Sequence, residues 1–569
     1  MNKNDIYQIK IEDISEEGMG IGHVDGMAVF VKDTVTGDLA DVKIVKVMKN
    51  YAFGRLEKLI EASDVRCEAK CPVARQCGGC IIQHMNYSAQ LDMKKSRVIN
   101  CLKRIGKVEN AEELCEGILG MEEVPFHFRN KMQFPIGLDR EGRAAIGFYA
   151  QRTHSIIPID DCLTGHPVNK NIISAVKRYI DESAVGVYDE EKGKGLLRHL
   201  ITRVGFATGE VMVALVVNGD SVPKKDKFLE LLGGAVDEYN ASAEKKLTLK
   251  SVMVNINKQK TNRIIGFESK CIFGEDHIFD YIGDVKFRIS VESFFQINAY
   301  QTGRLYGRAL QYAKLSGEEN VWDMYCGIGT ISLFLAGKAK EVYGVEIVPQ
   351  AIEDAKQNAE LNGFSNTSFY VGKAEDVVTD IYSTGGQGSK ADVIVVDPPR
   401  KGCDEKLLET ISSMSPERIV YVSCNPATLA RDVQILSGKG YELKKFTACD
   451  MFPHSGHVET VVCLSQQKPD DHIEIEINLD EIDATSAETK ATYKEIQDWV
   501  QEKYGLHVTN LNIAQVKQKH GIIERENYNK AKSADSKQPG SPEEKVKAIE
   551  DAMRHFQMIE EKMDDNRRN

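Results

Sequence analysis

One stretch constrains the possible folds of this chain more than any other: an apolar run, a glycine turn, a helical segment and a second apolar run that ends in an acid. The first run and its turn are Asn320-Val-Trp-Asp-Met-Tyr-Cys-Gly-Ile-Gly329, and a helix is predicted over residues 331–335. The second run covers residues 341–346 and ends at Glu346. A strand, a glycine-rich turn, a helix and a strand with a terminal acid make the βαβ unit that binds nucleoside cofactors. The sequence therefore predicts a Rossmann-like α/β domain.

The same unit favours one class of cofactor. Glu346 is placed to accept hydrogen bonds from two ribose hydroxyls, which a nucleoside cofactor offers. The third glycine of the G-x-G-x-x-G pyrophosphate fingerprint is missing here. This difference favours S-adenosylmethionine (SAM) over a nicotinamide dinucleotide. Residues 391–396 form another apolar run that ends at Asp397, so a further strand with an acid at its tip is predicted.

Cys424 follows a predicted buried strand, residues 418–423, and precedes Asn425, Pro426 and a helical segment. The carboxyl ends of strands are where α/β sheets keep their active sites, and a deprotonated cysteine is a strong nucleophile. A lone cysteine is more often a small buried hydrophobe, so its neighbours must decide between the two interpretations. Glu459 begins the last predicted strand, either as an exposed cap or, beside a catalytic cysteine, as a base.

A cysteine-rich loop indicates metal binding. The chain has 13 cysteines, an odd number in a sequence without a secretory signal, which disfavours a disulfide framework. Four of them, Cys67, Cys71, Cys77 and Cys80, lie within residues 67–80. Zinc could take all four, or an iron–sulfur cluster could take Cys71, Cys77 and Cys80 with Cys162 as a distant fourth ligand. The spacing differs from that of the radical SAM enzymes and disfavours a radical mechanism.

The first two regions of the chain have features of RNA-binding domains. Residues 1–61 predict a small OB-like β-barrel, because short alternating strands are separated by glycines, and the segment resembles a TRAM domain, a small RNA-binding module. Its second half is basic, which fits either RNA or an ordinary solvated face. Residues 62–290 predict a β-rich central domain with basic residues among aromatics. The net charge of −12 argues at face value against nucleic-acid binding, but the charge of local surface patches decides whether a protein binds nucleic acid.

The end of the chain departs from this pattern. Residues 291–466 hold the predicted α/β domain, 467–489 an acidic linker, and 490–569 a small helical accessory domain. Five basic residues in that last domain could contact RNA, although a plain docking role fits equally well: Lys517, Lys519, Arg525, Lys530 and Lys532. The N-terminus is polar, and no apolar run approaches the ~20 residues that span a bilayer. We therefore expect a cytoplasmic protein without a membrane association, and a monomer.

Several motifs together resemble the iron–sulfur-containing RNA uracil-5-methyltransferases that act on 23S ribosomal RNA. The resemblance covers about residues 1–466. It rests on these segments: the cysteines at 71, 77, 80 and 162, Ser293-Phe-Phe-Gln-Ile-Asn298, Asp323-Met-Tyr-Cys-Gly-Ile-Gly329, Asp397-Pro-Pro-Arg400, Ser423-Cys-Asn-Pro-Ala-Thr-Leu-Ala-Arg431 and Phe452-Pro-His-Ser-Gly-His-Val-Glu459. Related tRNA enzymes typically lack both the barrel and the cluster, so their presence here favours ribosomal RNA.

The resemblance implies a role for each candidate residue. It implies SAM contacts from Gln296, Tyr325, Glu346 and Asp397, and a [4Fe-4S] cluster on Cys71, Cys77, Cys80 and Cys162, with Cys67 outside. Uracil C5 is too weak a nucleophile to take a methyl group directly. Addition of the Cys424 thiolate at C6 would activate C5 for methylation, and Glu459 would then remove the C5 proton. The base would have to flip out of its helix to reach Cys424.

Two other functions remain open from the sequence. A tRNA uracil-5-methyltransferase would use the same chemistry on a different RNA. A non-catalytic iron–sulfur RNA-binding or redox-sensing protein would need neither Cys424 nor SAM.

Overall fold

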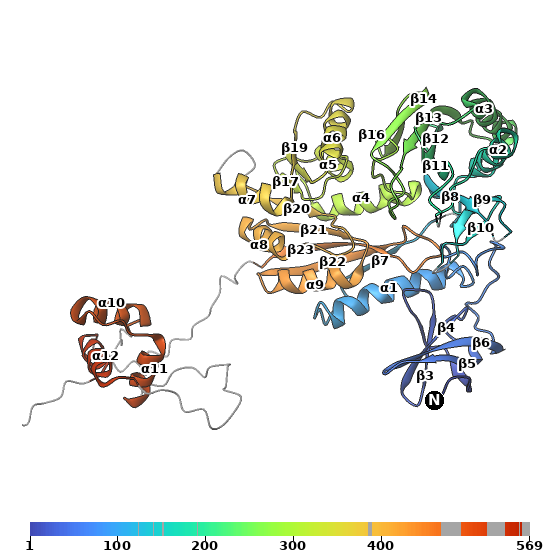
Figure 1. The fold of residues 1–569 in the computed structure, drawn as a ribbon. Coiled ribbons are helices and arrows are strands. Elements are labelled where there is room, and N and C mark those ends of the chain that lie inside the picture. Colours follow the sequence, from blue (N-terminus) through green and yellow to red (C-terminus); the bar gives the residue numbers. More distant parts are fainter. Residues whose placement is uncertain are drawn as a thin grey trace, which may run out of the picture. The chain divides into compact units, whose positions relative to one another are not determined.

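The protein is described by a computed structural model (Figure 1). The structure describes residues 1–122, 124–139, 141–150, 153–190, 192–384, 390–467, 491–520, 541–556 and 558–559. The chain divides into two compact units, Met1–Pro469 and Asp470–Asn569, and each is considered by itself. The predicted acidic linker, apart from residue 467, lies outside the described residues. In the described part of the chain, no helix combines the length and apolarity needed to cross a membrane.

The N-terminal region is the predicted small barrel. Its core comes from alternate strand residues, such as Val29, Val31 and Val42, whose side chains are inaccessible to solvent. Six strands form the sheet in the order β1-β5-β6-β4-β3-β2: Ile6–Lys10 (β1), Asp13–Ile14 (β2), Gly20–Val24 (β3), Met27–Lys32 (β4), Leu39–Val47 (β5) and Tyr51–Glu61 (β6).

The central region is a seven-stranded sheet covered by two helices. The strands run in the order β10-β9-β8-β11-β12-β13-β14: Lys131–Leu138 (β8), Ala144–Tyr149 (β9), Ile156–Pro158 (β10), Leu197–Val204 (β11), Glu210–Val217 (β12), Thr248–Ile256 (β13) and Glu268–Gly274 (β14). Helices α2 (Val168–Ser183) and α3 (Lys225–Ser242) pack their apolar residues on this sheet. A hairpin of β15 (Ile278–Ile282) and β16 (Val285–Ile289) follows.

The third region is the Rossmann-like sheet, in the order β19-β18-β17-β20-β21-β23-β22-β7. Its strands are Cys115–Leu119 (β7), Asn320–Asp323 (β17), Glu341–Glu346 (β18), Thr367–Val371 (β19), Val393–Val396 (β20), Arg418–Ser423 (β21), Tyr441–Cys449 (β22) and Glu459–Gln466 (β23). The first five in sheet order are parallel, and β23 runs antiparallel to β21 and β22. This reversal turns the start of β23 toward the carboxyl ends of its parallel neighbours.

Helices cover both faces of this sheet (Figure 1), so its strands are buried and nearly continuously apolar. One face packs against α4 (Ala299–Ala313), α5 (Thr330–Ala336) and α6 (Pro349–Leu361), and the other against α1 (Tyr87–Arg104), α7 (Ala374–Thr384), α8 (Glu405–Met414) and α9 (Pro426–Ser437). Both α1 and β7 come from the sequence before the central sheet. The chain therefore enters the Rossmann-like layer, leaves it for the central sheet, and returns.

A buried ion pair fixes α1 to the end of β22. Lys94 and Asp450 have no exposed side-chain surface, and Lys94 Nζ lies 2.5 Å from Asp450 Oδ1. Lys94 also donates to the Phe452 carbonyl at 2.9 Å, and the Tyr87 hydroxyl donates to Asp450 Oδ2 at 2.8 Å. Burial lowers the pKa of Lys94, and the adjacent carboxylate opposes that shift. Because Asp450 begins the loop that leads to Glu459, this ion pair anchors that loop.

The second unit has three described helices, α10 (Tyr493–Tyr504), α11 (Asn510–Lys519) and α12 (Glu543–His555). Capping boxes at Thr492 and Thr509 begin α10 and α11, and apolar residues from all three helices share one core. Lys517 is only 8% exposed and lies over the Tyr493 ring, while Lys519 pairs with Glu550 at 2.9 Å. Both lysines thus already have partners within the unit, and Arg525, Lys530 and Lys532 lie outside the described residues.

We expect Lys94→Met to destabilise the first unit by about 3–5 kcal/mol, because it leaves Asp450 buried without its cation. The urea concentration at the midpoint of unfolding measures the effect. Lys95→Met is the matched control, since Lys95 is a partly exposed neighbour that pairs with exposed Asp92 at 3.3 Å. Equal midpoints for the two variants would contradict the anchoring role of the Lys94–Asp450 pair.

Candidate active site

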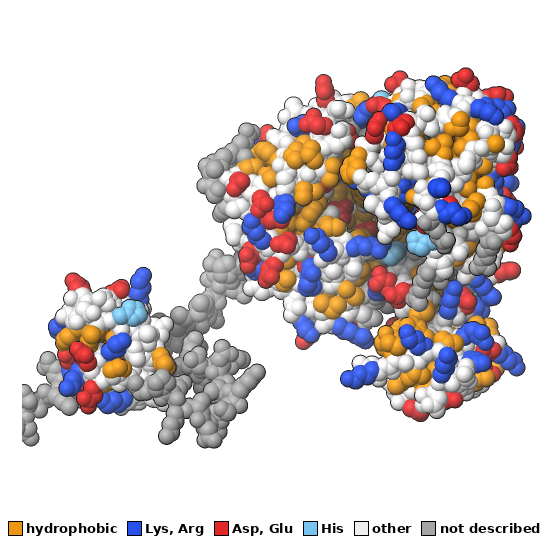
Figure 2. Space-filling model, viewed as in Figure 1, with side chains coloured by type: hydrophobic (Ala, Val, Ile, Leu, Met, Phe, Trp, Pro, Cys, Tyr) orange, Lys and Arg blue, Asp and Glu red, His pale blue; other side chains and the backbone are white. Residues whose placement is uncertain are grey.

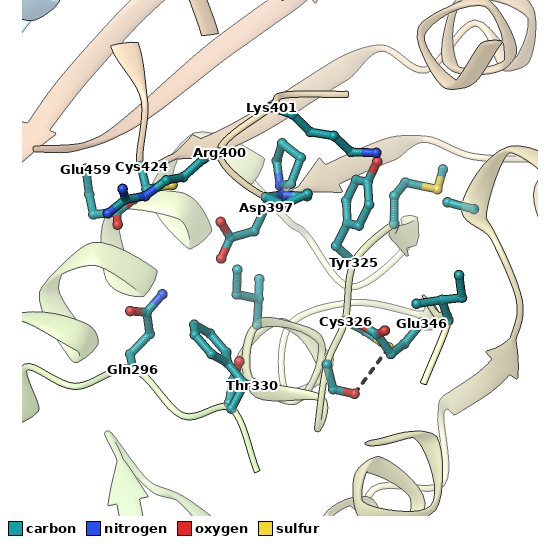
Figure 3. Close-up of a pocket in the computed structure, with 18 of the residues that line it drawn as sticks. Gln296, Tyr325, Cys326, Thr330, Glu346, Asp397, Arg400, Lys401, Cys424 and Glu459 are labelled. Atoms are coloured by element: carbon teal, nitrogen blue, oxygen red, sulfur yellow. Dashed lines mark hydrogen bonds between the residues drawn. The ribbon is translucent and has the colours of Figure 1, made fainter. Parts of the chain in front are cut away.

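A cavity of about 910 Å³ opens at the carboxyl ends of the parallel strands in the Rossmann-like sheet. All six residues that the sequence assigns to SAM or to catalysis line it: Gln296, Tyr325, Glu346, Asp397, Cys424 and Glu459. Figure 3 shows Cys424, Glu459 and Arg400 grouped at one end, Glu346 and Cys326 at the other, and Asp397 and Tyr325 between them. The cavity thus has a thiol end and a nucleoside end.

The nucleoside end is built by the glycine turn after β17. Gly327 and Gly329 have φ of 54° and 84°, in the left-handed region that glycine adopts without strain. A Cβ atom on Gly329 would lie 3.3 Å from the Ala355 Cβ, so glycine also lets α5 and α6 approach closely. Glu346 is the last residue of β18, and its Oε1 accepts from the Val348 amide at 3.0 Å. These features leave backbone and one carboxylate facing the cavity, as a bound nucleoside requires.

The thiol end is set by strand register. Ser423 of β21 pairs with Thr460 of β23, so the next position of this antiparallel ladder places Cys424 opposite Glu459. Asn425 caps α9, and its side chain accepts from the Ala427 amide at 3.0 Å. Ser423 Oγ accepts from the Asn425 amide at 3.1 Å. The turn that carries Cys424 is therefore held on both sides of the sulfur.

Three acidic groups share this end of the cavity with one cation. Burial raises the pKa of Cys424 to about 11, with Glu459 and Asp397 adding to the effect and Arg400 opposing it. Burial likewise raises the pKa values of Glu459 and Asp397, and Arg400 lowers that of Glu459. A positive charge brought close to these groups would favour their ionised forms.

Arg400 and His457 connect the thiol end to the N-terminal barrel. Arg400 Nη2 lies 3.4 Å from His457 Nε2, and His457 Nδ1 lies 3.9 Å from a carboxylate oxygen of Glu16 in the barrel. Glu16 also pairs with Arg97 of α1, which donates to the Gly456 carbonyl at 2.9 Å. A Cβ on Gly456 would lie 2.1 Å from the Glu16 carbonyl oxygen, so only glycine allows the barrel to approach this loop so closely.

The four cysteines assigned to a cluster share a second, small cavity. Cys71, Cys77, Cys80 and Cys162 all line it, whereas Cys67 lies outside it and donates its thiol to the Gln83 carbonyl at 3.5 Å. Gln83 also lines this cavity and is 4% exposed; its Oε1 accepts from the Cys71 amide at 2.7 Å, and its Nε2 has no partner among the described residues. Within the described ranges, no three or more His, Cys, Asp or Glu side chains are arranged so that they could hold a metal ion together. The cysteines therefore share a cavity without closing around one point.

Comparisons with known proteins agree with this arrangement. A family model described as tRNA (Uracil-5-)-methyltransferase matches residues 235–467, and a TRAM domain model matches residues 2–56. An uncharacterized RNA methyltransferase of Halalkalibacterium halodurans is 50% identical over 464 residues, covering 82% of this chain and 98% of its own. One of Clostridium acetobutylicum is 46% identical over 466 residues with the same coverage. The chain belongs to the RNA (uracil-5-)-methyltransferase family. It is a SAM-dependent enzyme that acts on RNA.

A solved structure extends the comparison to the fold. The Pyrococcus abyssi tRNA (uracil-54, C5)-methyltransferase, in complex with S-adenosyl-L-homocysteine, is 28% identical. It superposes with a TM-score of 0.63 over 80% of this chain and 100% of its own. The likeness confirms the predicted fold class of this methyltransferase: a TRAM barrel, a strand-rich region and a Rossmann-like domain, followed here by a helical tail.

The sequence of this methyltransferase did not by itself assign a role to Arg400, His457 or Phe294. All three lie in motifs that also hold candidate site residues: Asp397-Pro-Pro-Arg400, Gly456-His-Val-Glu459 and Ser293-Phe-Phe-Gln296. Phe294 lines the cavity and is 66% exposed, which is high for so large an apolar ring. A cation and aromatic rings within motifs that also hold candidate catalytic residues are the sequence feature that could have pointed to these three residues.

We expect Arg400→Leu to raise the pKa of Cys424, because the variant removes the cation that favours the thiolate. The ultraviolet absorbance of the thiolate, titrated with pH against a matched Cys424→Ser protein, measures this pKa. Lys401→Leu is the control, since Lys401 also lines the cavity but is not among the groups that shift Cys424. An unchanged Cys424 pKa in Arg400→Leu would show that Arg400 does not act on the thiol.

Proposed function

We propose that this enzyme methylates C5 of a uridine in 23S ribosomal RNA through a covalent bond between Cys424 and uracil C6. The observation that carries the proposal is the single cavity in which a strand-end thiol faces Glu459 and opens onto the nucleoside end. A monomer would suffice, because every candidate residue comes from one chain.

The residues divide the reaction into two easier steps. When bound, SAM supplies an electrophilic methyl group on a sulfonium. The Cys424 thiolate forms a bond to C6 of the flipped uracil, and the C5–C6 π electrons move onto the ring carbonyl as an enolate. C5 can then bond to the methyl carbon, and the electron pair of the broken S–CH₃ bond stays on the cofactor sulfur. These two steps require a thiol close to the nucleoside end of the cavity, so that the activated C5 can reach the methyl group.

Glu459 completes the reaction by removing the C5 proton. Its electron pair re-forms the C5–C6 double bond and expels Cys424 as a thiolate. Burial raises the pKa of Glu459, which makes its carboxylate a stronger base than an exposed glutamate. Gln296, Tyr325 and Glu346 would hold SAM, and Asp397, between the two ends, would contact SAM and the uracil edge.

A [4Fe-4S] cluster on Cys71, Cys77, Cys80 and Cys162 is part of the proposal. The shared cavity and the unpaired Gln83 amide support this ligand set, because a buried N–H without an acceptor is costly and cluster sulfur can accept it. Zinc on the four local cysteines fits less well, since Cys67 lies outside the cavity. The methyl transfer needs no electron from the protein, so we propose a structural or RNA-organising cluster.

The second candidate substrate is tRNA. The similar Pyrococcus abyssi enzyme is named for a tRNA uridine, which favours tRNA at this one point. The cysteine cavity favours ribosomal RNA, because the family resemblance pairs a cluster with 23S ribosomal RNA. The barrel does not separate the two substrates, since the tRNA enzyme matches 80% of this chain. Measuring methylation of each RNA by the same enzyme preparation distinguishes the two candidate substrates.

Methylation assays with labelled SAM, on 23S ribosomal RNA and on tRNA transcripts, test the mechanism and the substrate. We expect label in 23S ribosomal RNA with the wild type and none with Cys424→Ala, which should still bind SAM by calorimetry. Glu459→Gln should methylate but remain joined to the RNA on denaturing gels. Activity in Cys424→Ala would overturn the covalent step. Label in tRNA alone would overturn the ribosomal substrate, and normal release by Glu459→Gln would reduce Glu459 to a strand cap.

Iron and sulfide content after anaerobic reconstitution test the ligand set. We expect Cys162→Ser to have a weaker cluster absorbance and to lose about a quarter or more of the bound iron, because one of the four thiolate ligands is removed. Cys67→Ser should load like the wild type, since its thiol lies outside the cavity. Loss of iron from Cys67→Ser with normal loading of Cys162→Ser, or bound zinc in place of iron, would support a site made of Cys67, Cys71, Cys77 and Cys80.

A further inference from the structure

Helix α6 carries a row of polar side chains that the proposed reaction does not use. Asp354, Asn358 and the C-cap Asn362 recur every four residues, so they lie on one face of the helix. Asn358 has no exposed surface, and Asp354 is almost completely buried. Burying a polar group costs free energy unless the group is hydrogen-bonded, so the partners of these side chains indicate what the row does.

Asn358 joins two segments of the chain that both lead to the catalytic cavity. Its Oδ1 accepts from the Arg288 amide of β16 at 2.8 Å, and its Nδ2 donates to the Ile328 carbonyl at 3.1 Å. Ile328 is the middle residue of the glycine turn at the nucleoside end. Strand β16 leads into residues 290–296, which bring Gln296 to the cavity. One carboxamide therefore connects the glycine turn to the segment that carries Gln296.

Asp354 holds the same segment from one turn earlier on α6. Its Oδ2 accepts from Ser293 Oγ at 3.3 Å, and Ser293 Oγ itself accepts from the Ser290 amide at 3.0 Å. Arg203 of β11 in the central sheet donates to the carbonyls of Val291 and Ser293. Both α6 and the central sheet therefore fix the start of this segment.

The segment crosses from the central region to the Rossmann-like region. It follows the hairpin of β15 and β16 and precedes α4, which packs on the Rossmann-like sheet. Figure 2 shows the surface hollowed between these two regions. Phe294 and Gln296 both line the cavity. A displacement of the segment would therefore move two residues of the cavity wall.

We propose that Asn358, with Asp354 beside it, is a positioning residue for methyl transfer, because it sets the distance between the glycine turn and the segment that carries Phe294 and Gln296. The inference rests on the proposed function for the role of Gln296 as a cofactor contact. Asn358 is not among the residues that line the cavity, so it acts through the two segments that it joins. A displacement of about 1 Å in a reacting group can cost about 100-fold in rate.

Asn362 makes a similar set of hydrogen bonds without reaching the glycine turn. Its Oδ1 accepts from the Lys286 amide at 2.8 Å, and its Nδ2 donates to the Lys286 carbonyl at 2.7 Å. Its Nδ2 also donates to the Asn358 carbonyl at 2.7 Å. Asn362 thus joins α6 to the same strand, β16. If Asn358 served only to pack α6 against β16, the two asparagines would have equivalent effects on the enzyme.

The kinetics of full-length Asn358→Ala, with Asn362→Ala as the matched control, test the proposal. Each substitution removes a whole carboxamide, so we expect both variants to unfold at a lower temperature than the wild type. Only Asn358→Ala frees the glycine turn from β16, and we expect its kcat to fall about 100-fold. Calorimetry without RNA should show that this variant also binds SAM more weakly. Asn362→Ala should keep the kcat and the SAM affinity of the wild type.

A wild-type kcat in Asn358→Ala would overturn the proposal, and so would an equal loss of kcat in Asn362→Ala, which would reduce Asn358 to a packing residue. Circular dichroism checks that each variant is folded. If Asn358→Ala is unfolded, Ser293→Ala decides, because it removes the bond from Asp354 to the same segment. A lowered kcat in Ser293→Ala supports the proposal, and an unchanged kcat overturns it.

This test is separate from that of the proposed substrate. Each kcat is measured with whichever RNA the wild type methylates, and SAM affinity is measured without RNA. A failure of 23S ribosomal RNA as substrate would appear in the wild type, whereas a failure of the positioning role would appear only in the comparison between variants.

Discussion

The buried ion pair between Lys94 and Asp450 is the interaction on which the arrangement of the catalytic end depends. It joins a helix from the N-terminal part of the chain to the loop between β22 and β23. That loop carries His457 and leads directly to Glu459. Two charges without solvent contact are stable only when each has its partner, so the loop has one well-defined position. The close approach of Glu16 to Gly456 holds the same loop from the barrel side.

The electrostatics of the cavity follow from this placement. Cys424 and Glu459 lie beside the Arg400 guanidinium, Asp397 lies between them and the nucleoside end, and burial raises the pKa of each of the three acidic groups. The raised pKa values favour the protonated forms of Cys424, Glu459 and Asp397 over their ionised forms. A sulfonium-bearing cofactor brings a positive charge into the same cavity, and an opposite charge favours the ionised forms. Under the proposed mechanism, binding of the methyl donor would therefore favour the Cys424 thiolate.

Much of the fold was predictable from local patterns. The strand, glycine turn and helix at residues 320–335 follow from apolar periodicity and two glycines with positive φ, which few other residues tolerate. The predicted barrel and the helices of the second unit are likewise present. Long-range topology was not predictable. Strand β7 joins the Rossmann-like sheet at its far edge beside β22, and nothing within residues 115–119 indicates that partner.

For the candidate site, the sequence by itself determined which side chains stand at strand ends: Glu346, Asp397, Cys424 and Glu459 each border an apolar run. Only the tertiary structure decided which of them meet. The antiparallel insertion of β23 places Glu459 opposite Cys424, and register is a property of two strands together. The proximity of Arg400 to His457 and the cavity shared by Cys71, Cys77, Cys80 and Cys162 have the same origin. Local sequence sets the conformation of a segment, but distances between segments depend on how the cores pack.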